Sequence, residues 1–547
     1  MKRIVGLVIT LIIAAAVTTA CAANLLIPGA AGSGWIPPHA PPGALLAVTD
    51  LLPSSAALPA ASLPASSPTQ ALAQDIPTPI PALPTSLPTE AVEPVDPVVS
   101  PTPFSPPEPD APILYYSQAA DSLPVVAIRF GVLPTEITSP DPIPETAFIN
   151  PGQLLVIAHR LEQTTASTKL MPDSEVVFSP SATDFDIASF LGKAGGKLRS
   201  SPEWVPGTGM VSGANVIARI AAEDSVNPRL LLSLLEYQGG WVYGNPETET
   251  AIDYPMGYVD GNYKGLTRQL VWAINQLSIG YYAYREGRLT EIKFKDGSTA
   301  RLAPDLNAGT AALQYFFAQL YDRQGWEAAL DPQNGFPALH QKMFGDPWER
   351  AKNVEPLFPP GLKQPPLSLP FMRNWQWGYT GGPHGAWEQD GAYAALDFAP
   401  GSNESGCVAS STYATASASG LVVRSGRGVV VLDLDGDGRE QTGWVLVYLH
   451  IATDGKLPVG TWVDQGEPIG RPSCEGGVST GTHVHIARKY NGEWIPASGP
   501  LPFDLGGWIA HAGNEAYKGT LTRADQTLTA CTCSNPQTFI TRGPDDP

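Results

Sequence analysis

Positive charge and long hydrophobic runs are both scarce in this chain of 547 residues. Only 16% of the residues are charged, and 33 lysines and arginines face 52 aspartates and glutamates, so the formal net charge is -19. An acidic chain of this kind argues against nucleic acid as a partner. Cysteine is also rare, with 5 residues. The apolar run at residues 4–17 is too short to be a transmembrane anchor.

The N-terminal segment has the layout of a secretory signal peptide. Two basic residues precede the apolar run, and residues 18–21, Thr-Thr-Ala-Cys, follow it. An alanine directly before Cys21 fits lipoprotein processing, so we predict a signal peptide at 1–21 and a lipid on Cys21 that tethers the protein to a membrane. Cleavage after Ala22 and secretion is the alternative. Both routes predict an extracytoplasmic protein.

The length predicts several domains, and the 56 prolines indicate that part of the chain is linker. Residues 22–112 consist mainly of Pro, Ala, Ser, Thr and Leu without periodicity, which predicts a disordered, extended tether. Such a tether would hold the folded part well away from a membrane. At the other end, residues 514–547 show no pattern that we can interpret, and we treat them as a C-terminal tail.

Four histidines and one aspartate in the C-terminal third suggest a metal site. In residues 480–488, Thr-Gly-Thr-His-Val-His-Ile-Ala-Arg, apolar residues alternate with imidazoles, so a strand would project His483 and His485 to one face. Catalytic zinc takes three nitrogen or oxygen ligands from the protein plus a water. His384, Asp397 and one of the paired histidines could supply them. The alternative is a chance His-x-His pair.

Three segments of the same region occur in an order that resembles a known family. They are residues 443–450, Gly-Trp-Val-Leu-Val-Tyr-Leu-His, residues 463–470, Val-Asp-Gln-Gly-Glu-Pro-Ile-Gly, and residues 479–485, Ser-Thr-Gly-Thr-His-Val-His. Lysostaphin-type zinc endopeptidases are similar in building their groove from Tyr-x-His, Val-x-x-Gly-x-x-Ile-Gly and Gly-x-His-x-His segments. The resemblance implies an all-β zinc endopeptidase domain of antiparallel sheets at 367–513.

The first metal ligand departs from the commonest family pattern, His-x-x-x-Asp, because Tyr393 stands four residues before Asp397. His384 lies further upstream, at a distance similar to that in the β-lytic and staphylolysin branch, and we assign it as the ligand. The resemblance then implies three zinc ligands and two imidazoles beside the metal-bound water: His384, Asp397 and His485, and His450 and His483. Zinc lowers the pKa of its water to about 7 and polarises the scissile carbonyl. Neutral imidazoles can move the proton.

Four cysteines remain once Cys21 is set aside, an even number in an oxidising compartment, so we expect disulfides. Cys407 and Cys474 both fall within the metal domain near its motifs, and we predict a bridge between them. Cys531 and Cys533 are too close in sequence for an easy bridge. Their state is left open.

Residues 113–160 resemble a LysM module, a small βααβ unit. The likeness rests on Asp-Ser-Leu at 121–123, Ala-Ile-Arg-Phe-Gly at 127–131 and Asn-Pro-Gly-Gln at 150–153. LysM modules bind glycans that contain N-acetylglucosamine, which implies peptidoglycan as a partner. The glycine usual before the aspartate is here Ala120, and a structural unit without ligand is the alternative.

Residues 178–348 form a predicted helical domain, because runs such as 214–222 and 228–236 are spaced for buried helix faces. Residues 227–241 are similar to the catalytic-acid helix of lysozyme-like lytic transglycosylases. The resemblance makes Glu236 a candidate glycosidase general acid, with a pKa raised by desolvation. The alternative is a scaffold helix whose glutamate caps or pairs.

Residues 433–438, Asp-Leu-Asp-Gly-Asp-Gly, contain the first half of a calcium-loop pattern, with Asp433, Asp435 and Asp437 as candidate ligands. Position twelve of such a loop is Trp444 here and not glutamate. The apolar runs on both sides predict the tip of a β-hairpin, with Ca2+ binding as the alternative.

Together these patterns predict an exported peptidoglycan hydrolase, tethered to a membrane by a lipid, that cuts stem or cross-bridge peptides with a zinc-activated water. Two other functions fit the same sequence. One is a non-catalytic peptidoglycan-binding or regulatory lipoprotein, and the other is a secreted general metalloprotease.

Overall fold

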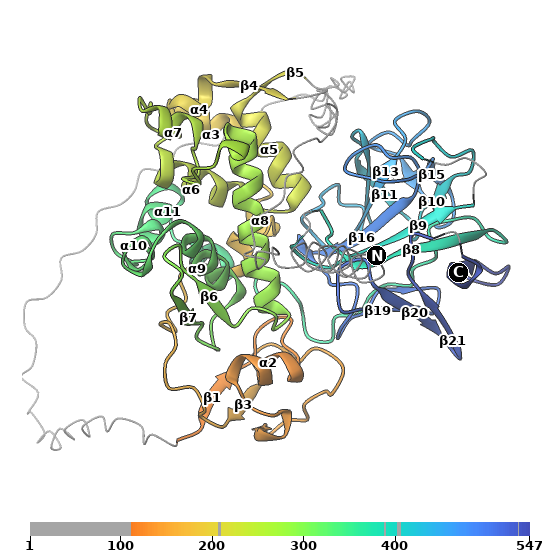
Figure 1. Cartoon of the computed structure of the whole chain (residues 1–547), viewed down its shortest axis with the longest axis horizontal. Helices are drawn as coiled ribbons and strands as arrows, with labels where there is room; N and C mark the ends of the chain where they lie inside the picture. Colours follow the sequence, from red (N-terminus) through yellow and green to blue (C-terminus); the bar gives the residue numbers. More distant parts are fainter. Residues whose placement is uncertain (1–110, 206–208, 388–389, 402–405, 534) are drawn as a thin grey trace, which may run out of the picture.

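The structure is a computed structural model that describes residues 111–205, 209–387, 390–401, 406–533 and 535–547. A helical domain stands beside a β-domain, and a small module of strands and one helix lies at one end of the helical domain (Figure 1). The predicted organisation of several domains, with helices in the middle and antiparallel sheets at the C-terminal end, is confirmed. Cys21, the signal peptide and nearly all of the predicted tether lie outside the described residues. Within the described ranges, no helix combines the length and the apolarity needed to cross a bilayer.

The module at the start of the described chain is built on one antiparallel sheet in the order β1-β3-β2. Its elements are β1 (Ile113–Tyr116), α2 (Leu123–Phe130), the 3-10 helix Pro134–Glu136, β2 (Ile137–Thr138) and β3 (Leu154–Ile157). A second α-helix, expected from the βααβ pattern, is absent from these residues. Four prolines between positions 134 and 144 remove backbone donors there, which disfavours a helix.

The helical domain contains ten α-helices and two short hairpins among its described residues. The helices are α3 (Ile187–Ala194), α4 (Lys197–Ser200), α5 (Gly213–Asp224), α6 (Pro228–Gly239), α7 (Glu249–Asp253), α8 (Leu266–Arg285), α9 (Ala308–Leu320), α10 (Arg323–Ala329), α11 (Phe336–Phe344) and α12 (Pro347–Ala351). The hairpins are β4 (Pro202–Val205) with β5 (Gly209–Ser212), and β6 (Glu291–Lys293) with β7 (Thr299–Arg301). Three single 3-10 turns complete the domain: Asp173–Glu175, Pro180–Ala182 and Gly261–Tyr263.

Local sequence explains where the central helices begin and how closely they pack. Asn227 caps α6 by accepting a hydrogen bond from the Arg229 backbone N–H, and Pro228 occupies the first helical position, where no donor is needed. In α8, a Cβ on Gly280 would lie only 2.8 Å from the Ala312 Cα of α9. This glycine therefore allows the two helices of the domain centre to approach each other closely.

Glu175 is a fully buried carboxylate that joins the start of the helical domain to its end. Arg350 of α12 holds it with two hydrogen bonds of 2.8 and 2.9 Å, and the His340 Nε2 lies 3.4 Å away. Burial alone would raise the pKa of Glu175, but Arg350 and His340 outweigh it and lower the pKa from 4.5 to about 2. The folded state therefore stabilises the ionised carboxylate.

This shift predicts acid-sensitive stability. A group whose pKa is lower in the folded state contributes stability above its unfolded pKa and loses it as pH falls toward the folded one. We expect the Glu175 contribution, about 3 kcal/mol, to be complete above pH 4.5 and lost between pH 4.5 and pH 2. Urea unfolding of the full chain at several pH values should show a shallower acid slope for E175Q. E349Q, at an exposed ion pair, should leave the slope unchanged, and equal slopes for E175Q and wild type would contradict the prediction.

The β-domain centres on a nine-stranded sheet in the order β14-β11-β12-β13-β16-β9-β8-β22, with β17 paired to β16. A four-stranded sheet, β18-β19-β20-β21, and the pair β10-β15 flank it. The strands are β8 (Gln376–His384), β9 (Ala395–Pro400), β10 (Ala414–Thr415), β11 (Gly420–Arg424), β12 (Gly428–Asp433), β13 (Trp444–Ile451), β14 (Trp462–Val463), β15 (Pro468–Gly470), β16 (Val484–Tyr490), β17 (Glu493–Trp494), β18 (Asp504–Leu505), β19 (Trp508–Ala512), β20 (Gly519–Arg523), β21 (Gln526–Thr529) and β22 (Phe539–Thr541).

The expected C-terminal tail at 514–547 is part of this fold. Strands β20 and β21 extend the four-stranded sheet, and β22 pairs with β8 at the edge of the large sheet. The boundary expected at residue 513 therefore cuts through a sheet. The strands here are only three to five residues long, too short for a clear period of two.

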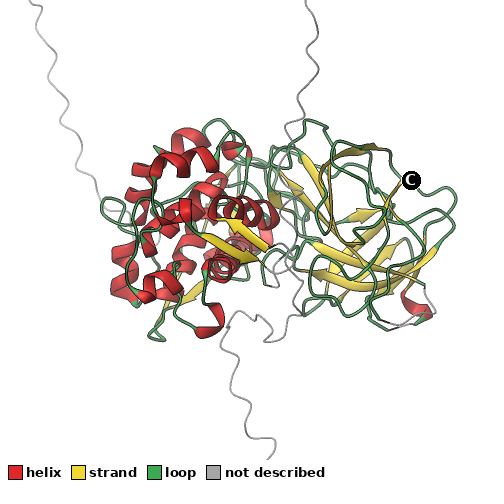
Figure 2. Ribbon diagram, turned by 90° about the horizontal axis from the view of Figure 1, so that it is seen from above, coloured by secondary structure: helices red, strands yellow, loops and turns green. Residues whose placement is uncertain are grey.

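The two faces of the large sheet pack against different partners. One face carries Leu446, Tyr448 and Ile486, which belong to the core of the β-domain itself. The opposite face carries Val447 and Ala487, which pack in one continuous core with the helical domain. Figure 2 shows the helices gathered on one side of the molecule and the sheets on the other. The helical domain thus covers part of one face of the sheet.

Arg285, at the end of α8, connects all three parts of the described chain. Its buried guanidinium forms ion pairs with Asp173 of the helical domain at 2.9 Å and with Glu493 of β17 at 3.0 Å. It also donates to the backbone carbonyl of Ala119 in the module. A buried guanidinium needs such partners, since removing one strands the opposite charge. The three parts therefore meet at one charged junction.

Candidate metal centre

Three side chains from three neighbouring strands converge on one point. His384 ends β8, Asp397 lies in β9 and His485 in β16, and all three are buried. The Asp397 Oδ1 lies 3.3 Å from the His384 Nε2 and 3.4 Å from the His485 Nδ1, and the two nitrogens are 3.1 Å apart. These are the residues that the sequence suggested as metal ligands. The structure brings one donor atom from each to a common centre.

Backbone carbonyls determine which ring nitrogen of each histidine is free. The His384 Nδ1 lies 2.8 Å from the Gly382 carbonyl oxygen, and the His485 Nε2 lies 3.0 Å from the Ala386 carbonyl oxygen. Because a carbonyl oxygen only accepts, both of these nitrogens carry hydrogens. The His384 Nε2 and the His485 Nδ1 then present lone pairs to each other, and neither can donate.

Asp397 adds a third acceptor to this centre. Its Oδ1 is buried and accepts no hydrogen bond from any described residue, although a buried oxygen without a donor is unfavourable. Burial would raise the pKa of Asp397, but positive charge on the neighbouring His384 and His483 rings outweighs it and holds the pKa well below its usual value, so this position favours positive charge beside the carboxylate. Two lone pairs and an ionised carboxylate oxygen facing one another are satisfied by a cation. The donor set of two imidazoles and one carboxylate fits zinc.

Two more imidazoles lie beside the three candidate ligands. The His483 Nε2 is 3.6 Å from the Asp397 Oδ1, and the ring centroids of His450 and His483 are 4.4 Å apart. The His483 Nδ1 faces the Gly481 carbonyl oxygen, and the His450 Nδ1 faces the Glu475 carbonyl oxygen. In the neutral form of each ring, the Nε2 is therefore free to accept. Burial, together with the nearby His483 and His485 rings, lowers the pKa of His450 to about 3. His450 is therefore neutral at pH 7.

Strand register explains why these side chains share a face. His485 pairs directly with Asp397 and with Leu449 of β13, so regular alternation would turn the next residue, His450, to the opposite face. A register shift between Gly428 and Val429 of β12 leaves His450 as an extra residue, with a φ of 61°. This β-bulge turns the ring back toward the metal ligands.

Two loops next to the two additional histidines are joined by a disulfide between Cys407 and Cys474, the bridge predicted from the sequence. The residue after Cys474 supplies the carbonyl that fixes His450. On the same loop, a Cβ on Gly477 would lie 3.4 Å from the His450 ring. Cys531 and Cys533, whose state the sequence left open, are also joined. The Cys407–Cys474 disulfide therefore holds in place the loop that contacts His450.

Tyr517 is a residue of this centre that the sequence did not indicate. Its ring stacks on His384 with centroids 4.0 Å apart, and its backbone exchanges hydrogen bonds with Gly382 and Pro383. Burial and the charge of Asp397 raise the pKa of Tyr517 to about 12, so the phenol keeps its proton at neutral pH. Tyr517 follows the boundary that we expected for the domain. No motif or period marks it.

Glu236, the candidate glycosidase acid, is half-buried at the end of α6, far in sequence from the metal ligands. Its Oε2 accepts hydrogen bonds from the backbone N–H groups of Val242 at 2.8 Å and Tyr243 at 3.0 Å. A carboxylate in this position closes the turn that follows the helix. These contacts support the interpretation of a structural, capping glutamate.

A substitution separates the two roles of Glu236. We expect E236Q to lower the free energy of unfolding by about 1 to 2 kcal/mol, because it weakens two hydrogen bonds to a charged acceptor. We expect neither E236Q nor wild type to release reducing sugar ends from peptidoglycan. The exposed neighbour variant E247Q serves as the control in both assays. Reducing ends released by wild type and E247Q but not by E236Q would instead support glycosidase chemistry.

The three aspartates of the candidate calcium loop connect β12 to β13 as a hairpin tip. Asp433 accepts hydrogen bonds from the N–H groups of Asp435, Gly436 and Gly438, and Asp437 accepts one from Arg439. The carboxylates thus serve the backbone of their own turn. The hairpin expected from the sequence is present.

An antiparallel sheet brings two imidazoles and a carboxylate to one buried point, with two more imidazoles at its rim. This donor set is of the kind that holds a single zinc ion in hydrolases. Comparisons with known proteins extend this description. Residues 169–357 match the family model described as LasA, N-terminal domain. That match covers the whole of the region, 178–348, in which we expected a lysozyme-like domain.

Two curated relatives are both named Protease LasA. The sequence from Pseudomonas aeruginosa strain UCBPP-PA14 is 26% identical over 377 residues, which cover 64% of this chain and 80% of that protein. The sequence from strain PAO1 is 26% identical over 379 residues with the same coverage.

Among solved structures, the M23 metalloprotease pseudoalterin is 22% identical with a TM-score of 0.26, covering 31% of this chain and 96% of its own. The catalytic domain of lysostaphin from Staphylococcus simulans is 25% identical with a TM-score of 0.17, covering 23% of this chain and 90% of its own.

Proposed function

We propose that this protein is an exported zinc metalloendopeptidase that hydrolyses peptide bonds of peptidoglycan. The observation that carries the proposal is the meeting of three buried acceptor atoms, on His384, Asp397 and His485, without a donor among the described residues. The two curated relatives named as proteases support the reaction class. The resemblance of the sequence motifs to lysostaphin-type enzymes supports the substrate.

The residues of the centre divide into two groups with different tasks. The His384 Nε2, the Asp397 Oδ1 and the His485 Nδ1 would hold the ion. A bound zinc ion supplies Lewis acidity, which polarises a peptide carbonyl and lowers the pKa of water. The hydrogen bonds from His384 and His485 to backbone carbonyls orient the rings, as partners of metal-ligating histidines do.

His450 and His483 provide the groups that move protons. The Nδ1 of each ring faces a backbone carbonyl, so in the neutral form the Nε2 of each is the acceptor. His483 is partly exposed, with 16% of its side chain accessible, so it can meet a substrate. A neutral imidazole in this place takes a proton from the attacking water and returns one to the leaving amine. Tyr517 fixes the ring plane of His384 from the other side.

The remaining parts of the chain serve localisation in this proposal. The module at 113–160 binds glycan strands, the lipid on Cys21 anchors the protein, and the tether at 22–112 spans the distance to the wall. The LysM resemblance and the signal sequence support these roles. The helical domain packs beside the β-domain that carries the proposed peptidase site.

The test is hydrolysis by the purified full chain with and without a metal chelator. We expect new amino groups to appear from peptidoglycan, the chelator to stop their release, and added zinc to restore it. Faster cleavage of a casein-like protein than of peptidoglycan would favour a general metalloprotease. A zinc-loaded protein that binds peptidoglycan but cleaves neither substrate would favour a non-catalytic, wall-binding role.

A further inference from the structure

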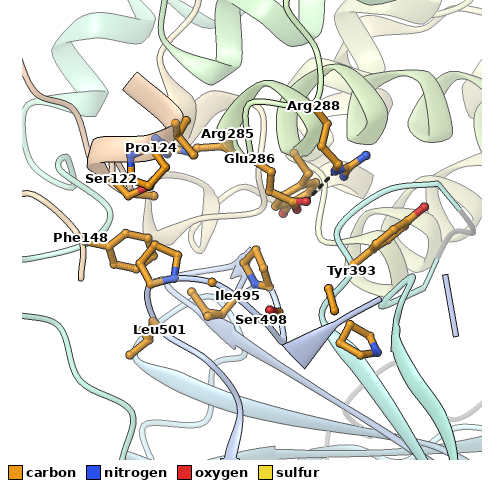
Figure 3. Close-up of a pocket in the computed structure, with 18 of the residues that line it drawn as sticks. Ser122, Pro124, Phe148, Arg285, Glu286, Arg288, Tyr393, Ile495, Ser498 and Leu501 are labelled. Atoms are coloured by element: carbon orange, nitrogen blue, oxygen red, sulfur yellow. Dashed lines mark hydrogen bonds and ion pairs between the residues drawn. The ribbon is translucent and has the colours of Figure 1, made fainter. Parts of the chain in front are cut away.

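Arg471, on the segment that follows β15, is a half-buried cation without an ion-pair partner among the described residues. Several other arginines that pack against the fold have such a partner, and Arg424 pairs with Glu440 at 2.7 Å. Figure 3 shows another pair of this kind, between Arg288 and Glu286, at the wall of a cavity where the module, the helical domain and the β-domain meet. The positive charge of Arg471 is thus not compensated within the described part of the chain.

One tyrosine holds the guanidinium of Arg471 in place. The Nη2 donates a hydrogen bond of 3.1 Å to the Tyr413 hydroxyl, and the Cζ lies 5.1 Å from the centroid of the Tyr413 ring. The Nε is buried, which leaves the two terminal nitrogens as the groups that a ligand can contact. The Nη1 is not buried and donates to no described residue, so this end of the guanidinium is open to a partner.

Strand pairing places Arg471 on the side of the sheet that faces away from the core of the β-domain. β10 pairs antiparallel with β15 through Ala414 and Gly470, and the next pair in this register is Tyr413 with Arg471. Ala414 packs in the core of the β-domain. Because side chains alternate along a strand, Tyr413 and Arg471 point away from that core.

The same side carries the histidines of the metal centre. Ser473 pairs directly with His483, while Pro472 pairs with Ile451 of the core. Arg471 and Ser473 therefore lie on the side of His483, and the two residues of strand between them span about 7 Å. Arg471 thus lies beside the candidate metal centre without belonging to its donor set.

A free carboxylate is the ligand that fits this arrangement. Two parallel N–H groups of a guanidinium match the two oxygens of a carboxylate, and the Nη1 with the second hydrogen of the Nη2 forms such a pair. Tyr413 fixes the guanidinium before a ligand arrives, which reduces the entropy lost on binding. An extended peptide advances by about 3.3 Å per residue, so Arg471 would meet a carboxylate a few residues from the bond at the metal.

We propose that Arg471 recognises a free carboxylate of the peptide that is bound at the metal centre, and that Tyr413 positions its guanidinium. Two sources supply that chemistry: the carboxyl end of a peptide and an acidic side chain. This role of Arg471 deepens the proposed function and rests on it for the path of the peptide. Binding to metal-free protein tests it separately from hydrolysis, because no turnover is needed.

The experiment titrates the full chain by calorimetry with two pairs of peptides, in chelator so that no carboxylate can bind zinc. Acetyl-tetraglycine is compared with its amide, and acetyl-Gly-Glu-Gly-Gly amide with the form that has glutamine in place of glutamate. We expect at least one acid to bind about tenfold or more tightly than its neutral partner, since the neutral form lacks the charged acceptor. The pair that shows this preference identifies the source of the carboxylate.

Variants assign the preference to its residues. R471Q should remove it, R471K, which keeps the charge without the planar fork, should retain part of it, and Y413F should reduce it by about threefold to tenfold. R373Q removes an exposed arginine of the same domain and should keep the wild-type preference. Thermal unfolding checks that each variant folds, and if R471Q does not, the wild-type comparison and Y413F decide.

Three results would overturn the proposal: equal binding of acid and neutral probes by wild type, a preference that survives in R471Q, or no binding of either acid. Each of them counts against Arg471 even if the protein hydrolyses peptidoglycan. A preference for the acids in a protein that cleaves nothing would instead support Arg471 as the receptor of an acidic peptide and refute the peptidase activity alone.

Discussion

Replacing Asp397 by alanine is expected to abolish zinc binding and to lower peptidase activity by about a thousandfold or more. A metal ion contributes several kcal/mol to the transition state, and each 1.4 kcal/mol is about a factor of ten in rate. Asp397 holds the centre of the site, within 3.6 Å of three imidazoles. Without it, His384 and His485 remain as only two of the three ligands. Zinc content after dialysis and the rate of amino-group release check the prediction.

Stability measurements distinguish this effect from simple unfolding. Zinc should raise the unfolding free energy of wild type, by about 4 kcal/mol at a thousandfold excess over its Kd, and should leave D397A unchanged. In chelator, D397A should still unfold in a single cooperative transition, which shows that its loss of zinc binding is not a loss of the fold. D454A, at an exposed aspartate of the same domain, is the control. A D397A protein that retained stoichiometric zinc would refute the assignment.

Removing the Cys407–Cys474 disulfide is expected to destabilise the β-domain and to slow hydrolysis together. The bridge closes a loop with a sequence separation of 67, and the chain-entropy model gives about 4 kcal/mol for a loop of this size. The activity should fall as well, because the residue after Cys474 supplies the carbonyl that orients His450. Urea unfolding and peptidase assays of C407S/C474S measure the two effects.

The second bridge provides a matched control. Cys531 and Cys533 are separated by two positions, so the same model gives C531S/C533S a loss of less than about 2 kcal/mol, and no catalytic histidine touches them. Zinc binding should survive in both double variants, because none of the three ligands depends on a cysteine. If C407S/C474S kept the wild-type rate under conditions where it stays folded, the loop would not position His450.

The strand that carries His485, β16, was predictable because its alternation is local, although it begins at Val484 and His483 directly precedes it. Val484 and Ile486 point into the core of the β-domain and His485 to the other face, as a period of two requires. Residue type alone made Asp397 and His384 possible ligands, but their assignment depended on the resemblance to a family, since they are far from the paired histidines in sequence. Strand pairing brings them together, and no single segment of sequence states that pairing.

Other parts of the site could not be predicted from the sequence. Tyr517 reaches His384 through the pairing of β19 with β20, a tertiary contact in short strands without a clear pattern. Glu236 fitted an acid on an apolar helix equally well, and only its contacts with Val242 and Tyr243 indicate a capping role. The junction at Arg285 joins segments that are far apart in sequence and gives no local signal at all.

The bulge at His450 means that the length of β13 is as important as its composition. Deleting Ile451 would restore regular pairing with β12, with His450 opposite Gly428. It would turn this imidazole to the far side of the sheet, toward the core that contains Leu446, Tyr448 and Ile486. The Tyr-x-His segment would still be recognisable in such a sequence, although its histidine would no longer lie beside the candidate metal ligands. Insertions and deletions in this strand therefore deserve the same scrutiny in homologous sequences as substitutions of the histidines themselves.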